Sequence, residues 1–178
     1  MKKKASKNQF QTVVADPPWM EKGGGKIRRG ADKHYSLLSV PEVIKTITQC
    51  EHWDDVTPDA HFYLWVTNNH LEDGLHVMKA LGFRYITNVA WIKNSMGLGQ
   101  YFRGKHELCL FGTRGRGVSV RTDDKSITSI VESPKTTHST KPDSFFDVVE
   151  KRSKGPYLEM FARRHRKGWT VWGDEVDS

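Results

Sequence analysis

The chain has only two cysteines among its 178 residues, Cys50 and Cys109. They stand far apart and outside any C-x-x-C pair, which argues against a disulfide framework and against a thiolate zinc site. No apolar run approaches the roughly eighteen residues that a membrane-spanning helix needs, and no apolar segment follows the basic start of the chain. The sequence therefore predicts a cytoplasmic protein without a membrane partner.

Motifs for several common cofactors are also missing. No predicted strand is followed by G-x-G-x-x-G, which argues against a nicotinamide or flavin enzyme, and Gly23–Gly25 lacks the lysine-serine ending of a P-loop. The eight histidines show no ligand spacing beside cysteines or carboxylates, so no metal is expected. Four of them are interpreted as ordinary surface or core residues, namely His52, His61, His70 and His76.

Positive charge is what the sequence has in excess. Lysine and arginine number 28 against 21 acidic residues, which gives a net charge of +7. This excess favours a polyanionic partner, and a merely soluble basic surface is the alternative. The length favours one catalytic domain over residues 1–178, with residues 1–9 as a basic segment expected to lie outside the ordered fold.

Apolar runs of strand length alternate with segments of helical periodicity. The predicted strands are Phe10–Ala15, Ala60–Val66, Arg84–Lys93, Glu107–Gly112, Tyr157–Phe161 and Trp169–Trp172. The predicted helices follow the capping-box pair Ser39 and Glu42 as far as His52, follow Asn69 as far as Gly82, and cover Lys141–Lys151. This alternation predicts a three-layer α/β fold with a mostly parallel central sheet and helices on both faces.

Two long segments show neither period. Glu21–Lys33 holds four glycines and five cations, and Gly112–Thr137 begins GTRGRG and then turns polar. Long irregular segments of compact domains are often lids or binding loops, with disordered surface loops as the alternative. Four arginines of these segments are predicted to contact phosphates or guanine edges of a nucleic acid, and they are Arg28, Arg29, Arg114 and Arg116.

The stretch Asp16-Pro17-Pro18-Trp19 directly follows the first predicted strand. An aspartate there points into the ligand crevice, and the two prolines remove two backbone donors, which leaves a rigid array of acceptors. We predict that the Asp16 carboxylate and the Pro17 carbonyl accept the two hydrogens of an adenine amino group, because this favours the pyramidal, nucleophilic nitrogen. The base is predicted to stack on Trp19, and an ordinary turn with a semi-buried tryptophan is the alternative.

This stretch is the first of an ordered series of motifs. The others are His34-Tyr35-Ser36, Phe62–Thr67, Trp91–Lys93, Lys105–Leu110, Ser139–Pro142 and Glu159–His165. The series resembles the adenine amino-methyltransferase family, which includes the catalytic subunit of the messenger-RNA adenosine methyltransferase and stand-alone bacterial and phage DNA enzymes. The resemblance covers Phe10 to Glu175. It implies an S-adenosylmethionine-dependent enzyme on a Rossmann-like sheet, with the catalytic strand early and the cofactor strand late.

The resemblance also implies roles for the catalytic and cofactor-binding residues. Asp16–Trp19 becomes the catalytic turn, with Asp16 also near the methionyl amino group of the cofactor. Lys141, at the start of the last predicted helix, would pair with the cofactor carboxylate. Arg163 and His165 follow a predicted strand and would reach the cofactor ribose.

Four further residues receive roles from the same resemblance. Asp174 and Glu175 stand where the messenger-RNA enzyme has an amide pair that touches the ribose and adenine of the cofactor. They are acids here, which keeps their ability to accept from a hydroxyl and changes the local charge. Tyr35 would close over the site and bind substrate, and Glu107 would be a structural or substrate-side acid.

Three functions follow from the resemblance. The favoured one is site-specific methylation of the adenine N6 amino group in double-stranded DNA, because stand-alone members of the family mostly look like DNA enzymes. The others are the same reaction on adenosine in RNA, and a catalytically silent nucleic-acid-binding partner, against which the intact Asp16–Trp19 turn argues. A base in duplex DNA must first be flipped out. A bacterial or phage-infected cytoplasm is expected, and both a monomer and a homodimer fit the sequence.

Overall fold

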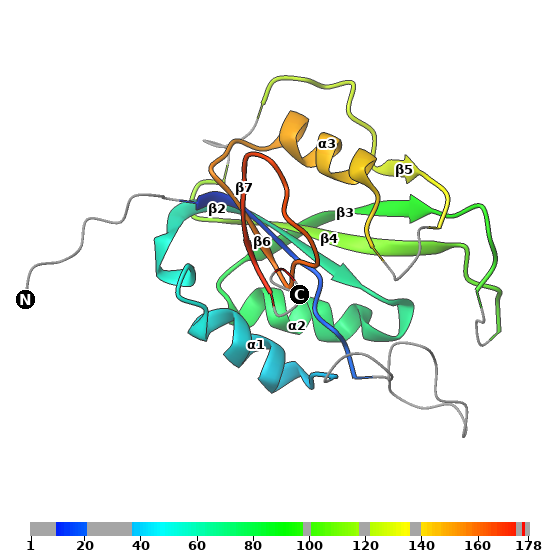
Figure 1. Ribbon diagram of the computed structural model, residues 1–178, viewed down its shortest axis with the longest axis horizontal. Coiled ribbons are helices and arrows are strands. Elements are labelled where there is room, and N and C mark those ends of the chain that lie inside the picture. Colours follow the sequence, from blue (N-terminus) through cyan, green and yellow to red (C-terminus); the bar gives the residue numbers. More distant parts are fainter. Residues whose placement is uncertain are drawn as a thin grey trace, which may run out of the picture.

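The computed structural model describes residues 10–20, 37–97, 101–117, 122–135, 140–173 and 176. The elements are β1 (Phe10–Ala15), α1 (Val40–Gln49), η2 (Trp53–Asp55), β2 (Val56–Val66), η3 (Asn68–His70), α2 (Leu71–Ala80), β3 (Arg84–Ile92), β4 (His106–Arg114), β5 (Ile130–Glu132), α3 (Asp143–Arg152), β6 (Tyr157–Met160) and β7 (Trp169–Trp172). Figure 1 shows one sheet with α1 and α2 on one face and α3 on the other. The predicted three-layer arrangement is confirmed.

The sheet has seven strands in the order β5-β3-β4-β2-β1-β6-β7. Every neighbouring pair is parallel except the two that contain β4, which runs antiparallel to both β2 and β3. The cause is the hairpin between β3 and β4, whose arms are joined by hydrogen bonds from Lys93 N to Lys105 O and from Gly97 N to Gly104 O, both 2.7 Å. The prediction of a mostly parallel sheet is confirmed, with β4 as the exception.

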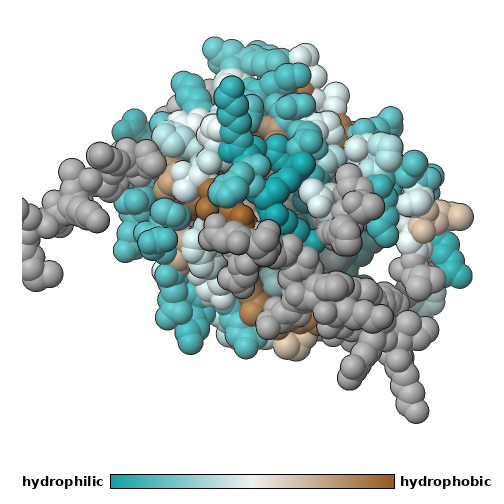
Figure 2. Space-filling view, viewed as in Figure 1, coloured by the Kyte–Doolittle hydropathy of each residue, from teal (hydrophilic) through white to brown (hydrophobic). Residues whose placement is uncertain are grey.

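The strands bury side chains on both faces, as strands of a covered sheet do. On β2, Phe62 and Leu64 join the core beneath α1 and α2, whereas Tyr63 and Trp65 join the core beneath α3. All four are at most 1% exposed. The outer surface seen in Figure 2 is mostly hydrophilic. No helix in the described ranges is long and apolar enough to cross a membrane.

The helix boundaries depart from the predicted ones in ways that matter for the site. The capping pair at α1 is present, since Glu42 Oε2 accepts from Ser39 N at 2.7 Å. Asn69 does not cap α2; it lies inside η3, and α2 begins at Leu71. Helix α3 begins at Asp143, so Lys141 stands in the extended segment before the helix rather than in its first turn.

The segment predicted to be irregular after Gly112 contains structure. Strand β4 continues to Arg114, and Ile130–Glu132 forms β5, which pairs with Ala90–Ile92 of β3. The sequence hid β5 because a three-residue strand is too short to show a period. This edge strand covers only the last third of β3.

Candidate active site

The first strand ends at the centre of the sheet, between β2 and β6. Ala15 pairs with Leu64 on one side and Met160 on the other, and Asp16 N donates to Met160 O at 3.4 Å. Asp16 therefore follows the carboxyl end of a central parallel strand, where open α/β sheets bind their ligands. The position predicted for it is confirmed.

The Asp16–Trp19 turn is held by main-chain hydrogen bonds. Pro17 O accepts from Trp19 N at 2.9 Å, and Pro18 O accepts from Leu38 N at 2.8 Å. Both prolines thus supply acceptors, as predicted, but both already have one donor. A carbonyl oxygen has two lone pairs, so Pro17 O keeps the capacity for one more hydrogen bond.

Trp19 has a different environment from the predicted one. Its side chain is buried, with 7% exposed, and its Nε1 donates to Trp65 O at 2.8 Å. The His70 ring stacks against it with centroids 5.4 Å apart and planes at 17°. Trp19 therefore anchors the turn to β2, and this geometry disagrees with its use as an open platform for a base. A buried indole commonly uses its N–H in this way.

Asp16 belongs to a chain of alternating charges drawn from four parts of the fold. Lys141 Nζ lies 2.8 Å from Asp16 Oδ2 and 3.4 Å from Glu107 Oε2, and Lys93 Nζ donates to the other oxygen of Glu107. The Lys141 side chain is 10% exposed, and its ammonium lies 5.1 Å from the Trp65 ring centroid. Two cations therefore balance two carboxylates in a half-buried setting, where an unpaired charge would be costly.

Two groups of this chain, Lys141 and Glu107, have pKa values shifted by their surroundings. Burial works against the charge of Lys141, but Asp16 and Glu107 outweigh it, so the pKa of Lys141 lies above its ordinary value. Burial likewise disfavours ionised Glu107, yet Lys141 and Lys93 bring the pKa of that carboxyl below its ordinary value. Lys141 thus stays charged and holds the Asp16 carboxylate in one orientation.

A second carboxyl group, Glu159 of β6, faces the same region and was given no role from the sequence. Its side chain is 15% exposed, and burial raises its pKa to about 7, with Arg166 opposing and Asp16 adding to the rise. Arg166 Nε lies 3.6 Å from Glu159 Oε2, which is too long for a hydrogen bond. Within the described chain, this oxygen is buried without a hydrogen-bond partner. The only sequence signal was one acid inside the apolar strand Tyr157–Met160.

Asp16, Lys141 and Glu159 line one small pocket. Its lining residues are Asp16, Thr140, Lys141, Phe146, Glu159, Phe161, Arg163, Arg164 and Arg166. The structure thus brings together three of the residues predicted to bind cofactor, Asp16, Lys141 and Arg163. His165 is exposed and is not among these lining residues.

The charged residues that line this pocket match the groups of S-adenosylmethionine, which carries a carboxylate, an ammonium group and ribose hydroxyls. The cations at Lys141 and Arg163 match a carboxylate, and the carboxylates of Asp16 and Glu159 match an ammonium or a hydroxyl. The buried, unpartnered Glu159 Oε2 is an acceptor that such a donor would satisfy. The residues present therefore fit the group.

Two arginines predicted to bind substrate lie elsewhere. Because β4 is antiparallel, its last residues approach the edge opposite Asp16. Arg114 lies four residues beyond Leu110, the residue level with Ala15 across β2, which is about 13 Å along the strand. Its guanidinium donates to two main-chain carbonyls at the start of β2, at 3.0 and 2.8 Å. The structure therefore places Arg114 and Arg116 away from Asp16, and their predicted contacts with a nucleic acid stay a prediction.

Five other predicted site residues lie outside the described residues: Arg28, Arg29, Tyr35, Asp174 and Glu175. Their roles stay predictions, as does that of residues 1–9. In the part of the chain that the structure describes, no three His, Cys, Asp or Glu side chains gather as metal ligands do. His61 and His70 bind other side chains, His61 Nδ1 to Ser153 Oγ at 2.7 Å and His70 Nδ1 to Asp73 Oδ2 at 2.8 Å.

Comparison with known proteins gives the family. A family model described as MT-A70 matches residues 10–175. The chain belongs to the MT-A70 family. Its similarity to the adenine amino-methyltransferases, first indicated by the motif series, is thereby confirmed, and the Rossmann-like methyltransferase fold agrees with it.

Several curated MT-A70 relatives align with almost the whole chain. Human "N(6)-adenosine-methyltransferase catalytic subunit METTL3" is 26% identical over 95% of this chain and 28% of its own length. A rice "Probable N(6)-adenosine-methyltransferase MT-A70-like" is 28% identical over 95% of this chain and 23% of its own. "N6-methyladenosine RNA methyltransferase MTA1" of Cryphonectria parasitica is 29% identical over 94% and 52%. The chain therefore spans about a quarter to a half of the length of these relatives.

Proposed function

We propose that this protein is an S-adenosylmethionine-dependent methyltransferase that acts on the exocyclic N6 amino group of adenosine. The observation that carries the proposal is the Asp16 carboxylate, fixed at 2.8 Å by Lys141 at the end of a central strand. It borders a pocket whose cations and carboxylates match the charged groups of the cofactor. The similarity to N(6)-adenosine-methyltransferases supports the same chemistry.

The residues of the turn act on the amino group of the base. Its nitrogen is a poor nucleophile because its lone pair is delocalised into the ring. The Asp16 carboxylate accepts one N–H, and the second lone pair of Pro17 O accepts the other, which favours the pyramidal nitrogen. Lys141 and the anchor at Trp19 keep these two acceptors in place. When bound, S-adenosylmethionine supplies the methyl group on its sulfonium sulfur.

RNA is the substrate class that we propose. The sequence alone favoured double-stranded DNA, but the relatives are named as adenosine or RNA methyltransferases, which supports adenosine in RNA better. The hairpin between β3 and β4 leaves the sheet at the same edge as Asp16. It carries Tyr101 and Phe102, 98% and 88% exposed, next to the exposed cations Arg103 and Lys105. Exposed rings beside cations suit unpaired bases of a single strand and its phosphates.

A methyl-transfer assay tests the reaction and the substrate class together. The purified chain is incubated with labelled S-adenosylmethionine and sequence-matched single-stranded RNA, single-stranded DNA and duplex DNA, and the product nucleoside is identified by mass spectrometry. The expected product is N6-methyladenosine in RNA, absent with Asp16→Ala. Methylation of duplex DNA alone would show that the substrate is double-stranded DNA, as the sequence alone favoured. No transfer to any of the three would contradict the proposed reaction.

The hairpin is tested in the same assay. The double variant Tyr101→Ala/Phe102→Ala is expected to raise the KM for RNA at least about tenfold, because base stacking contributes roughly 1–3 kcal/mol per base. Leu71→Ala/Leu75→Ala is the matched control, since these side chains are exposed on α2. An unchanged KM in the hairpin variant would exclude the rings from the substrate site.

A further inference from the structure

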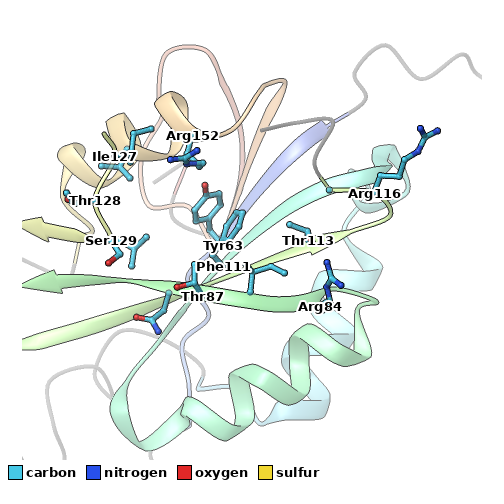
Figure 3. Close-up of a pocket in the computed structure, with 15 residues that line it drawn as sticks. Tyr63, Arg84, Thr87, Phe111, Thr113, Arg116, Ile127, Thr128, Ser129 and Arg152 are labelled. Atoms are coloured by element: carbon cyan, nitrogen blue, oxygen red, sulfur yellow. The ribbon is translucent and has the colours of Figure 1, made fainter. Parts of the chain in front are cut away.

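A second, larger pocket lies on the α3 face of the sheet, away from Asp16. It encloses about 320 Å³, which is within the range of small-molecule sites. Its lining comes from β2, β3 and β4, the turn after β4, the segment 127–129 and the end of α3. Figure 3 shows Arg84 and Arg116 at one end, Ile127, Thr128 and Ser129 at the other, and Arg152 above Tyr63 and Phe111.

The floor of this pocket is aromatic and uncharged. The Tyr63 and Phe111 rings lie 4.9 Å apart at 51°, and Val89 and Val148 extend the apolar surface. Tyr63 Oη shares a hydrogen bond with Ser153 Oγ at 2.7 Å, and burial raises the pKa of the phenol, which stays neutral. Such a floor accommodates the flat ring of a ligand.

The walls carry polar groups and three arginines. The polar side chains are Thr87, Asn88, Thr113, Thr128 and Ser129. The arginines come from three separate elements, Arg84 from β3, Arg116 from the turn after β4, and Arg152 from the last residue of α3. Among the described residues that line the pocket, none is aspartate or glutamate. The charge of the lining therefore favours an anion.

Two of the arginines are positioned by neighbouring groups. Arg152 donates to Asp124 O at 2.8 Å and to Thr122 O at 3.3 Å, which fixes its guanidinium to the segment that leads toward β5. Asp124 also interacts with Arg152 electrostatically, but its carboxylate accepts from Ser126 N and Oγ, at 2.9 and 2.6 Å. A guanidinium with N–H groups left over can still bind an oxyanion.

The turn that carries Arg116 is rigid. Gly115 and Gly117 both have positive φ, +64° and +61°, and a Cβ on Gly115 would lie 2.2 Å from Asp59 Oδ1. Arg116 N donates to the same Asp59 oxygen, and Gly117 O lies 2.9 Å from His61 Nε2. These contacts fix the backbone of the turn, and they hold Arg116 at the mouth of the pocket.

We propose that this pocket binds a free nucleoside monophosphate, with the base over the Tyr63–Phe111 floor and the phosphate at the end that carries Arg84 and Arg116. An aromatic floor, hydroxyl-bearing walls and guanidinium groups are the partners that a base, a ribose and a phosphate need. The site is separate from the proposed catalytic pocket and shares no lining residue with it.

The location of binding is tested by titrating the isotope-labelled protein with AMP and following its amide NMR signals. The expected shifts fall on Thr87, Thr113 and Ser129. Shifts confined to Asp16 and Glu159 would instead assign AMP to the catalytic pocket and overturn the proposal. Because this readout needs no methyl transfer, it can succeed or fail independently of the proposed reaction.

The chemistry is tested by calorimetry with four probes. AMP is expected to bind at least about tenfold more tightly than adenosine, because a charge-assisted contact to phosphate is lost in the nucleoside. It should also bind more tightly than inorganic phosphate and than the methyl ester of AMP, which imitates a phosphate inside a chain. Tighter binding of the ester would assign the pocket to a polynucleotide and overturn the proposal of a free nucleotide.

The role of the arginines is tested by replacing Arg84 and Arg116. Both are exposed, so their replacement should leave the fold intact. Arg84→Gln/Arg116→Gln is expected to weaken AMP binding at least about tenfold. The control Lys45→Gln/Lys79→Gln removes the same charge from exposed positions on α1 and α2, on the other face of the sheet, and should bind as the wild type does. Equal affinity for AMP in the two double variants would show that Arg84 and Arg116 do not bind the phosphate, and it would overturn the proposed site.

Discussion

The Lys141 ammonium lies 2.8 Å from the Asp16 carboxylate, although 125 positions separate the two residues. Asp16 directly follows the first strand and Lys141 precedes the last helix, so only the finished fold makes this contact. Removing the acid is expected to leave Lys141 with Glu107 as its remaining carboxylate partner within this chain of charges. We therefore expect Asp16→Ala to fold but to lose methyl transfer by at least about a hundredfold, since it loses a positioned acceptor.

Circular dichroism and the transfer assay measure these two effects for Asp16→Ala. Asp123→Ala, which removes an exposed acid that does not line the site, is the control and should keep its activity. Turnover near the wild-type level in Asp16→Ala would contradict the proposed role of the carboxylate.

Lys141→Met is expected to weaken binding of the cofactor and of S-adenosylhomocysteine. The loss of one charge-assisted contact corresponds to roughly 1.5–3 kcal/mol, or about tenfold or more in Kd. Affinity for RNA should change little, because Lys141 is 10% exposed and lines the pocket rather than the hairpin. Calorimetry with each ligand separates the two effects. Equal affinity for S-adenosylhomocysteine in mutant and wild type would remove Lys141 from the cofactor site.

Glu159 makes stability depend on pH. Its pKa is raised from 4.5 to about 7 in the folded protein, mainly by burial, so the folded state binds more protons than the unfolded state between these values. The free energy of unfolding therefore falls as the pH rises through this window, by about 3 kcal/mol in total, and is flat above it. Glu159→Gln, which cannot ionise, should lack this loss.

Urea unfolding followed by tryptophan fluorescence at several pH values between about 4.5 and 8 measures the difference. Glu72→Gln, at an exposed position on α2, should retain the pH dependence of the wild type. Parallel stability curves for Glu159→Gln and the wild type would show that the buried carboxyl has an ordinary pKa.

Variants of Trp19 distinguish a role in anchoring the turn from a role in stacking on a base. Trp19→Phe keeps a ring against His70 but removes the hydrogen bond to Trp65 O, and should lower the free energy of unfolding by about 1 kcal/mol. Trp19→Ala should cost about 3–5 kcal/mol by opening a cavity. Chemical denaturation checks both values. A raised KM for RNA with unchanged stability in Trp19→Phe would instead support the predicted stacking on a base.

Local patterns were enough to predict much of the fold. Strand Phe10–Ala15, the capping pair Ser39 and Glu42, and strand Trp169–Trp172 agree with the structure because each depends on residues within one short segment. The Asp16–Trp19 turn was located for the same reason. Prolines and an acid directly after an apolar run restrict the backbone whatever the rest of the chain does.

Features that depend on contacts between distant segments were not predicted. The reversed direction of β4 moved Arg114 to the opposite edge, and nothing in its own sequence marks that direction. The carboxyl of Glu159 was overlooked because its significance arises from burial beside Asp16 and Arg166. Stacking of a base on Trp19 was predicted without knowledge of His70, which stacks on the indole, and of the Trp65 carbonyl, which accepts its N–H.

The antiparallel strand β4 also bears on how enzymes of this family can diverge. Strand β4 is paired along its length with β2 on one side and β3 on the other. The hairpin that leads into it therefore projects beyond strands whose register is already set by this pairing. A change in the length or composition of that hairpin is therefore expected to leave the strand register, and with it the position of Glu107, unaltered. Exchange of this segment between homologues should therefore transfer the proposed substrate preference, while the Asp16–Lys141 site is left unchanged.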